Sequence, residues 1–459
     1  MNNRNNKMVL LGNAPIPKAL MAMGIPTMLG MMVNAIYNLV DAYFVGSLGT
    51  SQMGAISVVY PLGQVVVGLG LLFGNGSASY LSRLLGKGDK EKANQVASTA
   101  LYSSITVGAI MIILSIIFLR PILKFLGATD SIMPYAITYA SIYIISCIFN
   151  VFNVTMNNIV TSEGAAKTTM CALMTGAILN IGLDPVFIYI LNMGVAGAAI
   201  ATAISQIVST LVYLTFILRK KSTYHFRIRN FSFTKDIMSE IFKIGIPTLV
   251  FQILTSLSIS FVNTKSMVYG DSVIAGMGAV TRIVSMGSLM VFGFIKGFQP
   301  IAGYSYGAKK FYRLQEAIKT SILWSTIFCV IYGLILAIFS KGIISQFTKM
   351  DLDMIRVGTQ SLRINGFSFM LFGFYTVYSS LLLALGKGLA GFFLGACRQG
   401  ICFIPVILIL PVFWGINGIM YAQPIADVLS AVITIFMAVH LHKELALSKQ
   451  KFLSGQQNT

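Results

Sequence analysis

The sequence predicts an all-α protein that crosses a membrane about twelve times, in two related six-helix lobes. Hydrophobic residues make up 56% of the 459 residues, and charged residues make up only 10%. The mean hydropathy is +0.79. Because soluble domains carry about a quarter charged residues, this composition fits only a polytopic membrane protein.

Apolar stretches of bilayer length recur along the whole chain, since about 20 helical residues suffice to cross the hydrocarbon core. Short polar connectors separate them. The predicted spans cover residues 20–46, 53–80, 96–118, 132–160, 170–191, 196–218, 244–266, 275–302, 320–339, 354–384, 389–411 and 418–440.

An internal duplication relates the two halves of the chain. The motif Gly-Ile-Pro-Thr at 24–27 recurs at 245–248, and the separation of Gly24 from Gly245 is called here the repeat offset. Gly86 and Gly307 are separated by the same offset, as are the segments 194–197 and 415–418. A shared offset indicates a duplicated unit of six spans. Because six is even, both copies insert with the same orientation, as in transporters with parallel repeats and a substrate path between the halves.

The most polar and basic long connector falls between the sixth and seventh spans. We therefore expect an N-terminal lobe at 1–225, a cytoplasmic linker at 226–243 and a C-terminal lobe with a cytoplasmic tail at 244–459.

Positive charge is concentrated in alternate connectors and in both tails, and the net charge is +19. By the positive-inside rule this side is cytoplasmic, together with both termini. We expect a multi-pass protein of the cell (plasma or inner) membrane, in contact with membrane lipid and without a nucleic-acid partner. The five cysteines lie in apolar runs without metal-ligand spacing, so we expect no disulfide framework and no cofactor.

The first span combines an apolar helix with a polar stripe. Asn34, Tyr37, Asn38 and Asp41 recur at spacings of three and four residues and so share one helix face. An ionised Asp near a helix centre in a bilayer costs about 2.5–3.5 kcal/mol, so such residues are by default functional candidates. A neutral Asp that only bonds a neighbouring helix is the alternative. Pro26 predicts a kink, and hence a hinge, about four turns earlier.

A second intramembrane carboxylate, Asp184, follows Asn180 by one helical turn, and the next span offers Ala198 and Thr202 at the same spacing. Oxygen ligands suit a hard cation or a proton rather than zinc or copper. Two carboxylates brought close together would share a proton. Na⁺ at Asp41, Asn180, Asp184 and Thr202 is possible, whereas Asn180 and Thr202 taken singly fit ordinary interhelical hydrogen bonds.

Further polar residues lie in other apolar runs. In the fourth span, Asn153 and Asn157 extend the polar lining formed by Asn34 and Tyr37. The candidates in the second half are Arg282, Lys296, Arg398, Gln423 and Asp427. We expect Asp427 to form a structural ion pair with Arg398.

In these features the chain resembles the multidrug and toxic compound extrusion (MATE) family, in its DinF-like branch. The resemblance covers about 15–440. It is carried by Pro26 with the segment 38–46, by Asn180 with Asp184-Pro185, by the segment 194–202, and by Gln299-Pro300 to Gly307-Ala308.

The resemblance implies a V-shaped pair of six-helix lobes that exports amphipathic, often cationic compounds in exchange for inward Na⁺ or H⁺. We expect it to function as a monomer. The branch's first-lobe cation site carries over to Asp41, Asn180, Asp184, Ala198 and Thr202, and cation binding is coupled to a bend at Pro26. Tyr37 and Asn157 match polar positions that line the same lobe.

The chain departs from the family's patterns at two places. Its seventh span has no carboxylate between Thr248 and Thr264, where the other main branch has one. Lys296 replaces a small or polar residue, which would disfavour cationic drugs nearby.

Two other functions are weighed against export. A flippase for lipid-linked precursors would use a cationic cavity, for which Arg282, Lys296 and Arg398 are candidates. An intramembrane aspartyl protease would use Asp41 and Asp184 as its dyad, but Asp184 stands in Gly182-Leu183-Asp184-Pro185 and not in the Gly-x-Gly-Asp setting of such enzymes. We therefore expect a transporter and not an enzyme. The choice between Na⁺ and H⁺, and the substrate, stay open.

Overall fold

The computed structural model describes residues 2–46, 48, 50–126, 128, 130–346 and 351–457. Within these ranges every regular element is helical. The first half contains α1 (Asn2–Gly12), α2 (Ile16–Gly46), α3 (Thr50–Lys87), α4 (Lys90–Ile117), α5 (Leu119–Phe125), α6 (Met133–Ser162), α7 (Ala166–Pro185), the π-helical turn η1 (Val186–Ile190) and α8 (Gly194–Leu218).

A connector containing the 3-10 turn η2 (Ile228–Asn230) leads to the second half. That half contains α9 (Lys235–Met267), α10 (Asp271–Gly307), α11 (Phe311–Ile338), α12 (Ser340–Ile344), α13 (Leu352–Phe369), α14 (Phe372–Ala384), α15 (Gly388–Ala396), the π-helical turn η3 (Cys397–Ile401), α16 (Phe403–Trp414) and α17 (Ile416–Gln457). Helix α9 begins inside the predicted linker, because Ile237, Met238 and Ile241 pack into a cluster with α3 and α4.

In the described part of the chain, 11 helices are long and apolar enough to cross a membrane. Helices α13 and α14, bent by 52° at their junction, together make a twelfth span. These observations confirm the predicted fold class of about twelve transmembrane helices.

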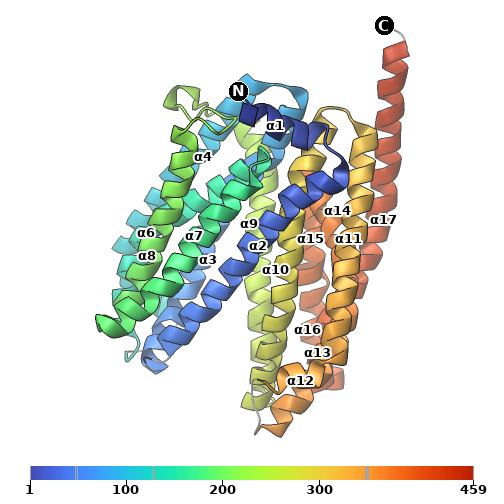
Figure 1. The fold of residues 1–459 in the computed structure, drawn as a ribbon. Helices are drawn as coiled ribbons and strands as arrows, with labels where there is room; N and C mark the ends of the chain where they lie inside the picture. The colour runs from blue at the N-terminus through green and yellow to red at the C-terminus, as the bar shows by residue number, and fades with distance from the viewer. Residues whose placement is uncertain are drawn as a thin grey trace.

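Two arms of helices form a V (Figure 1). Helices α2, α3, α4, α6, α7 and α8 make one arm, and the helices from α9 to α17 make the other. The arms meet at the end that carries both chain termini, called here the terminal side, and diverge at the opposite end (Figure 1).

The duplication is visible in backbone conformation as well as in sequence. Gly194 and Gly415 are separated by the repeat offset and have φ angles of +53° and +55°. Gly88 and Lys309 are separated by the same offset, with φ angles of +80° and +56°. A backbone conformation with positive φ is therefore repeated at two pairs of equivalent turns. Glycine adopts it at three of the four positions, and Lys309 adopts it at the fourth.

Glycines let the arms pack closely where they meet. A Cβ on Gly297 of α10 would stand 2.5 Å from the backbone nitrogen of Gly24 on α2. At the crossing of α3 with α9, Gly76 and Gly245 likewise face the backbone of the opposite helix. The repeat offset relates Gly76 to Gly297 and Gly24 to Gly245, so the two crossings are copies of one contact. Small residues allow such close helix packing in membranes. We call these two crossings the glycine seam.

On the terminal side, α1 lies across both arms as a strap. Lys7 Nζ donates to Glu163 Oε1 (3.0 Å), beyond the end of α6. From the other arm, Arg313 Nε donates to the carbonyl of Leu11 (3.0 Å) and Lys310 Nζ donates to that of Gly12 (2.9 Å). Cations near the C-terminal end of a helix interact favourably with the helix dipole. The strap therefore ties the arms together on the side where they already meet.

Pro26 lies within α2, which continues from Ile16 to Gly46 as one helix. The predicted kink does not interrupt the helix. The next residue, Thr27, is buried, and its hydroxyl lies 2.8 Å from the carbonyl oxygen of Met23 and 2.6 Å from that of Gly293 on α10. Thr27 thus links the turn that contains Pro26 to the glycine seam.

Candidate functional site

Asp41 on α2 and Asp184 on α7 meet inside the first arm. Gly30 lets these helices approach, because a Cβ there would come within 3.0 Å of Leu173 Cδ1 on α7. The two carboxyl groups lie within hydrogen-bonding reach of each other, and Asp184 is fully buried. Because a carboxylate can only accept, a hydrogen bond between two carboxyl groups requires a proton on one of them. Two carboxyl groups this close can share one proton.

Asn180 and Thr202 extend this pair toward α8. With its amide nitrogen turned to Asp184, Asn180 donates to Asp184 Oδ2 (3.1 Å), and its oxygen accepts from the backbone N–H of Thr202 (3.3 Å). Ala198, one helical turn before Thr202, is fully buried. The structure therefore brings together four of the five residues proposed for cation coupling, from helices α2, α7 and α8, whereas Ala198 packs in an apolar cluster with Ile188 and Val195.

One oxygen of each carboxyl group lacks a hydrogen-bond partner. Oδ1 of Asp41 and Oδ1 of Asp184 are buried without a hydrogen-bond partner, and a buried acceptor without a donor costs about 1–3 kcal/mol. Across the described ranges, no group of three or more His, Cys, Asp or Glu side chains could hold a metal ion. The donors here, two carboxyls with an amide and a hydroxyl, fit a proton or Na⁺ better than a transition metal.

Tyrosines surround the carboxyl pair. Tyr37 on α2 and Tyr139 on α6 each interact electrostatically with both Asp41 and Asp184. The Tyr139 ring stacks on Tyr143 with 5.7 Å between the ring centroids. Sequence reasoning missed Tyr139. Its signal, tyrosines four residues apart on α6, resembles an ordinary apolar helix face.

The other polar residues predicted to line the first lobe are not part of the carboxyl site. Asn34 is exposed on α2, and the side chain of Asn38 lies outside the described residues. Asn153 donates to Gln206 Oε1 (2.8 Å) and accepts from the Thr210 hydroxyl (3.0 Å). The structure thus places Asn153 in a hydrogen-bond network between α6 and α8.

In the second arm, Asp427 is buried with a full set of partners. Arg398 Nε donates to its Oδ1 (2.7 Å), Gln423 Nε2 donates to the same atom (2.9 Å), and the Ser368 hydroxyl donates to Oδ2 (2.8 Å). The guanidinium of Arg398 also lies 4.6 Å from the ring centroid of Phe372. The predicted ion pair between Arg398 and Asp427 is confirmed, and Gln423 belongs to it.

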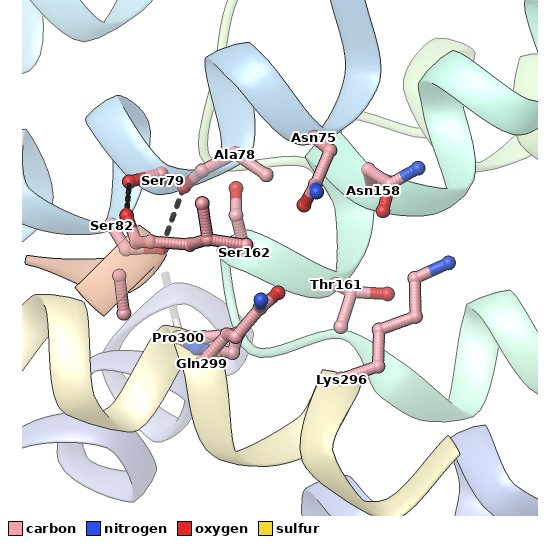
Figure 2. A pocket seen from close by; sticks show the side chains of 12 residues that line it. Asn75, Ala78, Ser79, Ser82, Asn158, Thr161, Ser162, Lys296, Gln299 and Pro300 are labelled. Carbon is pink, nitrogen blue, oxygen red and sulfur yellow. Dashed lines mark hydrogen bonds between the residues drawn. The ribbon is translucent and has the colours of Figure 1, made fainter. Parts of the chain in front are cut away.

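Lys296 on α10 crosses between the arms and donates to Asn157 Oδ1 on α6. Asn157 in turn donates to the Tyr213 hydroxyl (3.4 Å). Figure 2 shows the Lys296 side chain at the edge of a small cavity, with Thr161 and Asn158 beside it. Within the described ranges, no carboxylate pairs with Lys296. Arg282 lies exposed elsewhere on α10, so the cationic candidates do not form one cluster.

Twelve apolar spans in two repeated arms, with a buried polar site inside one of them, define a polytopic membrane transporter. The MatE family model matches residues 26–186 and 247–409, and the repeat offset also separates the starts of these two segments. The chain belongs to this family of transporters.

Individual relatives match over nearly the whole chain. "Multidrug export protein MepA" of Staphylococcus aureus (strain MSSA476) is 30% identical over 455 residues, covering 98% of this chain and 100% of its own. A solved outward-facing multidrug resistance MATE transporter of the MOP superfamily is 26% identical, with a TM-score of 0.89, covering 95% and 98% of the two chains. A MOP superfamily transporter from Pyrococcus furiosus, described as having a binding pocket of reverse polarity that suggests a different function, is 25% identical. Its TM-score is 0.90, over 96% of this chain and 98% of its own.

Proposed function

We propose that the chain exports amphipathic, often cationic drugs or toxic compounds by alternating access, in exchange for inward H⁺ or Na⁺. The observation that carries this proposal is the buried pair of Asp41 and Asp184, with one unsatisfied oxygen on each. Similarity to multidrug export proteins supports the class of substrate.

Helix α2 connects the Asp41–Asp184 pair to the contact between the arms. When the shared proton leaves, two carboxylates repel each other in a medium of low dielectric constant. Asp41 lies on α2, and the same helix carries Gly24 and Thr27 at the glycine seam. A shift of α2 away from α7 would therefore change the helix packing where the arms meet. A bound Na⁺ would replace the proton by neutralising the same oxygens.

Energetics favour competition between drug and coupling ion. One pH unit supplies about 1.4 kcal/mol, and 100 mV of membrane potential adds about 2.3 kcal/mol per charge. Swinging a two-state equilibrium from 1:99 to 99:1 requires about 5.5 kcal/mol of differential binding. One ion's gradient is smaller than this, so drug and ion must each stabilise a different facing state.

The terminal side is proposed to face the cytoplasm, in the cell membrane. Its connectors carry most of the 33 Lys and Arg residues, in keeping with the positive-inside rule. The V opens on the other side (Figure 1), so this arrangement is the outward-open one. We expect a monomer to suffice, because both arms come from one chain.

The test is export of a fluorescent cationic dye from proteoliposomes with an imposed Na⁺ gradient, an imposed pH gradient, or neither. For the wild type, we expect transport to follow one gradient. Asp41→Asn should reduce that flux to the level without a gradient. The matched control is Asp353→Asn, which removes an exposed carboxylate and should leave the flux unchanged. Flux that ignores both gradients, or survives Asp41→Asn, would contradict ion-coupled exchange.

A second candidate is a flippase for anionic lipid-linked precursors. Lys296, a cation at the meeting of the arms without a carboxylate partner in the described ranges, favours it, and the Pyrococcus furiosus relative shows that pocket polarity varies among similar structures. In the same proteoliposomes, inhibition of dye export by anionic rather than cationic amphiphiles, lost in Lys296→Gln, would support this candidate.

A hydrogen-bonded Asp pair is also the arrangement of an aspartyl protease dyad. Membership in a transporter family argues against this activity, and we propose that the chain is not an enzyme. Peptide cleavage that disappears in Asp41→Asn would overturn this.

A further inference from the structure

A groove of about 240 Å³ opens on the first arm between the terminal-side ends of α7 and α8. It lies at the opposite end of α7 from Asp184 and belongs to no part of the transport site described above. Helix α7 begins at Ala166 and α8 ends at Leu218, and both helices are membrane spans. The groove therefore lies at the depth where a span leaves the hydrocarbon and enters the headgroup layer.

Three cations line the groove: Lys167, Arg219 and Lys221. All three are exposed, and none takes part in an ion pair within the described ranges. The neighbouring carboxylate, Glu163, is already engaged, because Lys7 binds its Oε1 and the Ser222 hydroxyl donates to its Oε2 (3.1 Å). The groove thus has a net positive charge that the surrounding side chains do not neutralise.

The rest of the lining combines Thr168, Cys171 and Thr215 with two apolar side chains of α8. Val212 and Phe216 line the groove. On other faces of the same stretch of α8, Leu211, Leu214 and Leu218 are 52%, 38% and 78% exposed. Exposed leucines on a membrane span face acyl chains. The groove therefore offers cations at the headgroup level beside an apolar wall formed by Val212 and Phe216.

We propose that this groove binds an anionic phospholipid, with its phosphate among Lys167, Arg219 and Lys221 and its acyl chains along α8. Basic pockets between membrane helices at this level recognise anionic headgroups, and Arg and Lys both bind phosphate. A soluble anion would use the cations alone, whereas a lipid uses the cations and the apolar wall together.

The bound lipid would also touch the anchor of the strap. Lys7 Nζ lies 4.6 Å from the ring centroid of Phe216 and donates to the carbonyl of Lys221 (2.8 Å). Two of the residues that line the groove thus hold α1. Lipid binding would order the segment that secures the strap to the first arm.

Cys171 provides a reporter inside the groove. It is exposed and lines the groove, whereas the other four cysteines, Cys147, Cys329, Cys397 and Cys402, are buried. The experiment measures the rate of maleimide modification of Cys171 in the detergent-purified full chain. The additions are short-chain phosphatidylglycerol, short-chain phosphatidylcholine, or inorganic phosphate.

We expect phosphatidylglycerol to slow modification of Cys171 several-fold, and phosphatidylcholine and phosphate to have little effect. The triple variant Lys167→Gln/Arg219→Gln/Lys221→Gln should lose this protection. The matched control, Lys87→Gln/Lys235→Gln/Lys319→Gln, removes the same charge from exposed lysines outside the groove and should keep it.

Equal protection by phosphatidylcholine would overturn the role of the cations, and equal protection by phosphate would overturn the choice of a lipid. Protection that persists in the triple variant would place the lipid elsewhere. Modification is measured without transport, so these outcomes do not depend on ion-coupled export. A matching thermal unfolding midpoint for the triple variant and its control confirms that both are folded.

Discussion

The two arms contain buried aspartates in opposite settings. In the second arm, Arg398, Gln423 and Ser368 satisfy Asp427. In the first arm, Asp41 and Asp184 face each other, and each retains a buried oxygen without a donor. A buried carboxylate with a full set of partners stabilises the fold. A carboxyl pair with unsatisfied oxygens can instead bind and release a proton or Na⁺.

The contrast arose within a duplicated framework. At the repeat offset after Asp41 and Asp184 stand Val262 and Pro405, and at the same offset before Asp427 stands Gln206. Gln206 is also hydrogen-bonded, to Asn153. Duplication therefore supplied the helices and the glycine seam twice, whereas the carboxyl pair was placed in one copy only.

The largest expected effect tests whether Asp427 is structural. Arg398→Met leaves a buried carboxylate without its cation, which should lower the free energy of unfolding by about 3–5 kcal/mol. Adding Asp427→Leu should recover most of the loss, because no buried charge then remains. Thermal or denaturant unfolding in detergent measures both.

The companion variant for the first arm is Asp184→Asn. Asn has nearly the same shape and can donate to Asp41, so we expect a change in unfolding free energy of less than about 1 kcal/mol, within the range of a single hydrogen bond. If Asp184→Asn destabilised the fold as much as Arg398→Met, the distinction between the two settings would be lost.

A smaller effect tests the glycine seam that both copies share. Gly297→Ala would place a Cβ against the backbone of Gly24, and overpacking of this kind costs about 1–3 kcal/mol. We expect a lower unfolding midpoint and slower dye export. The control lies in the same helix, since a Cβ on Gly278 would have no neighbouring atom within 4 Å.

Gly278→Ala should instead be neutral or stabilise α10 by up to about 1 kcal/mol, through the higher helix propensity of Ala. If the two alanines behave alike, the close approach of the arms at Gly297 is not what holds them together.

Features set by local pattern could be predicted from the sequence. The number of spans follows from apolar run length, and the duplication follows from the repeat offset. The grouping of Asp41, Asn180, Asp184 and Thr202 rested partly on helical spacing and partly on family resemblance. The pairing of Arg398 with Asp427 could be expected because two buried opposite charges in one lobe cost less together.

Contacts between segments without a shared pattern could not be predicted. Lys296 reaches Asn157 only because the arms meet at α10, and Tyr139 reaches the carboxyl pair only because α6 turns that face inward. The strap depends on Lys7, within α1 itself, and on Arg313, in α11 of the second arm. Each of these contacts is fixed by how helices are placed relative to one another.

The smallest expected effect contrasts the buried carboxyls with one outside the membrane spans. Asp351 precedes α13 and accepts from the backbone N–H of Met354 (2.9 Å) and from the Ser272 hydroxyl. These hydrogen bonds to the charged form hold the pKa of Asp351 below its ordinary value. Because the folded pKa is the lower one, the stabilisation is present above the ordinary pKa of about 4 and is lost as the pH falls through the folded value.

Asn also caps helices but does not titrate, so Asp351→Asn should remove only this pH-dependent part. Unfolding midpoints of wild type and variant, measured from about pH 7 down to about pH 3, should therefore differ by a constant amount above the ordinary pKa of about 4 and converge or cross below it. A difference that stays constant over the whole range would mean that the cap does not depend on the charge of Asp351. In that case Asp351 would contribute through its shape alone, and it would not be a charged counterpart to the first-arm pair.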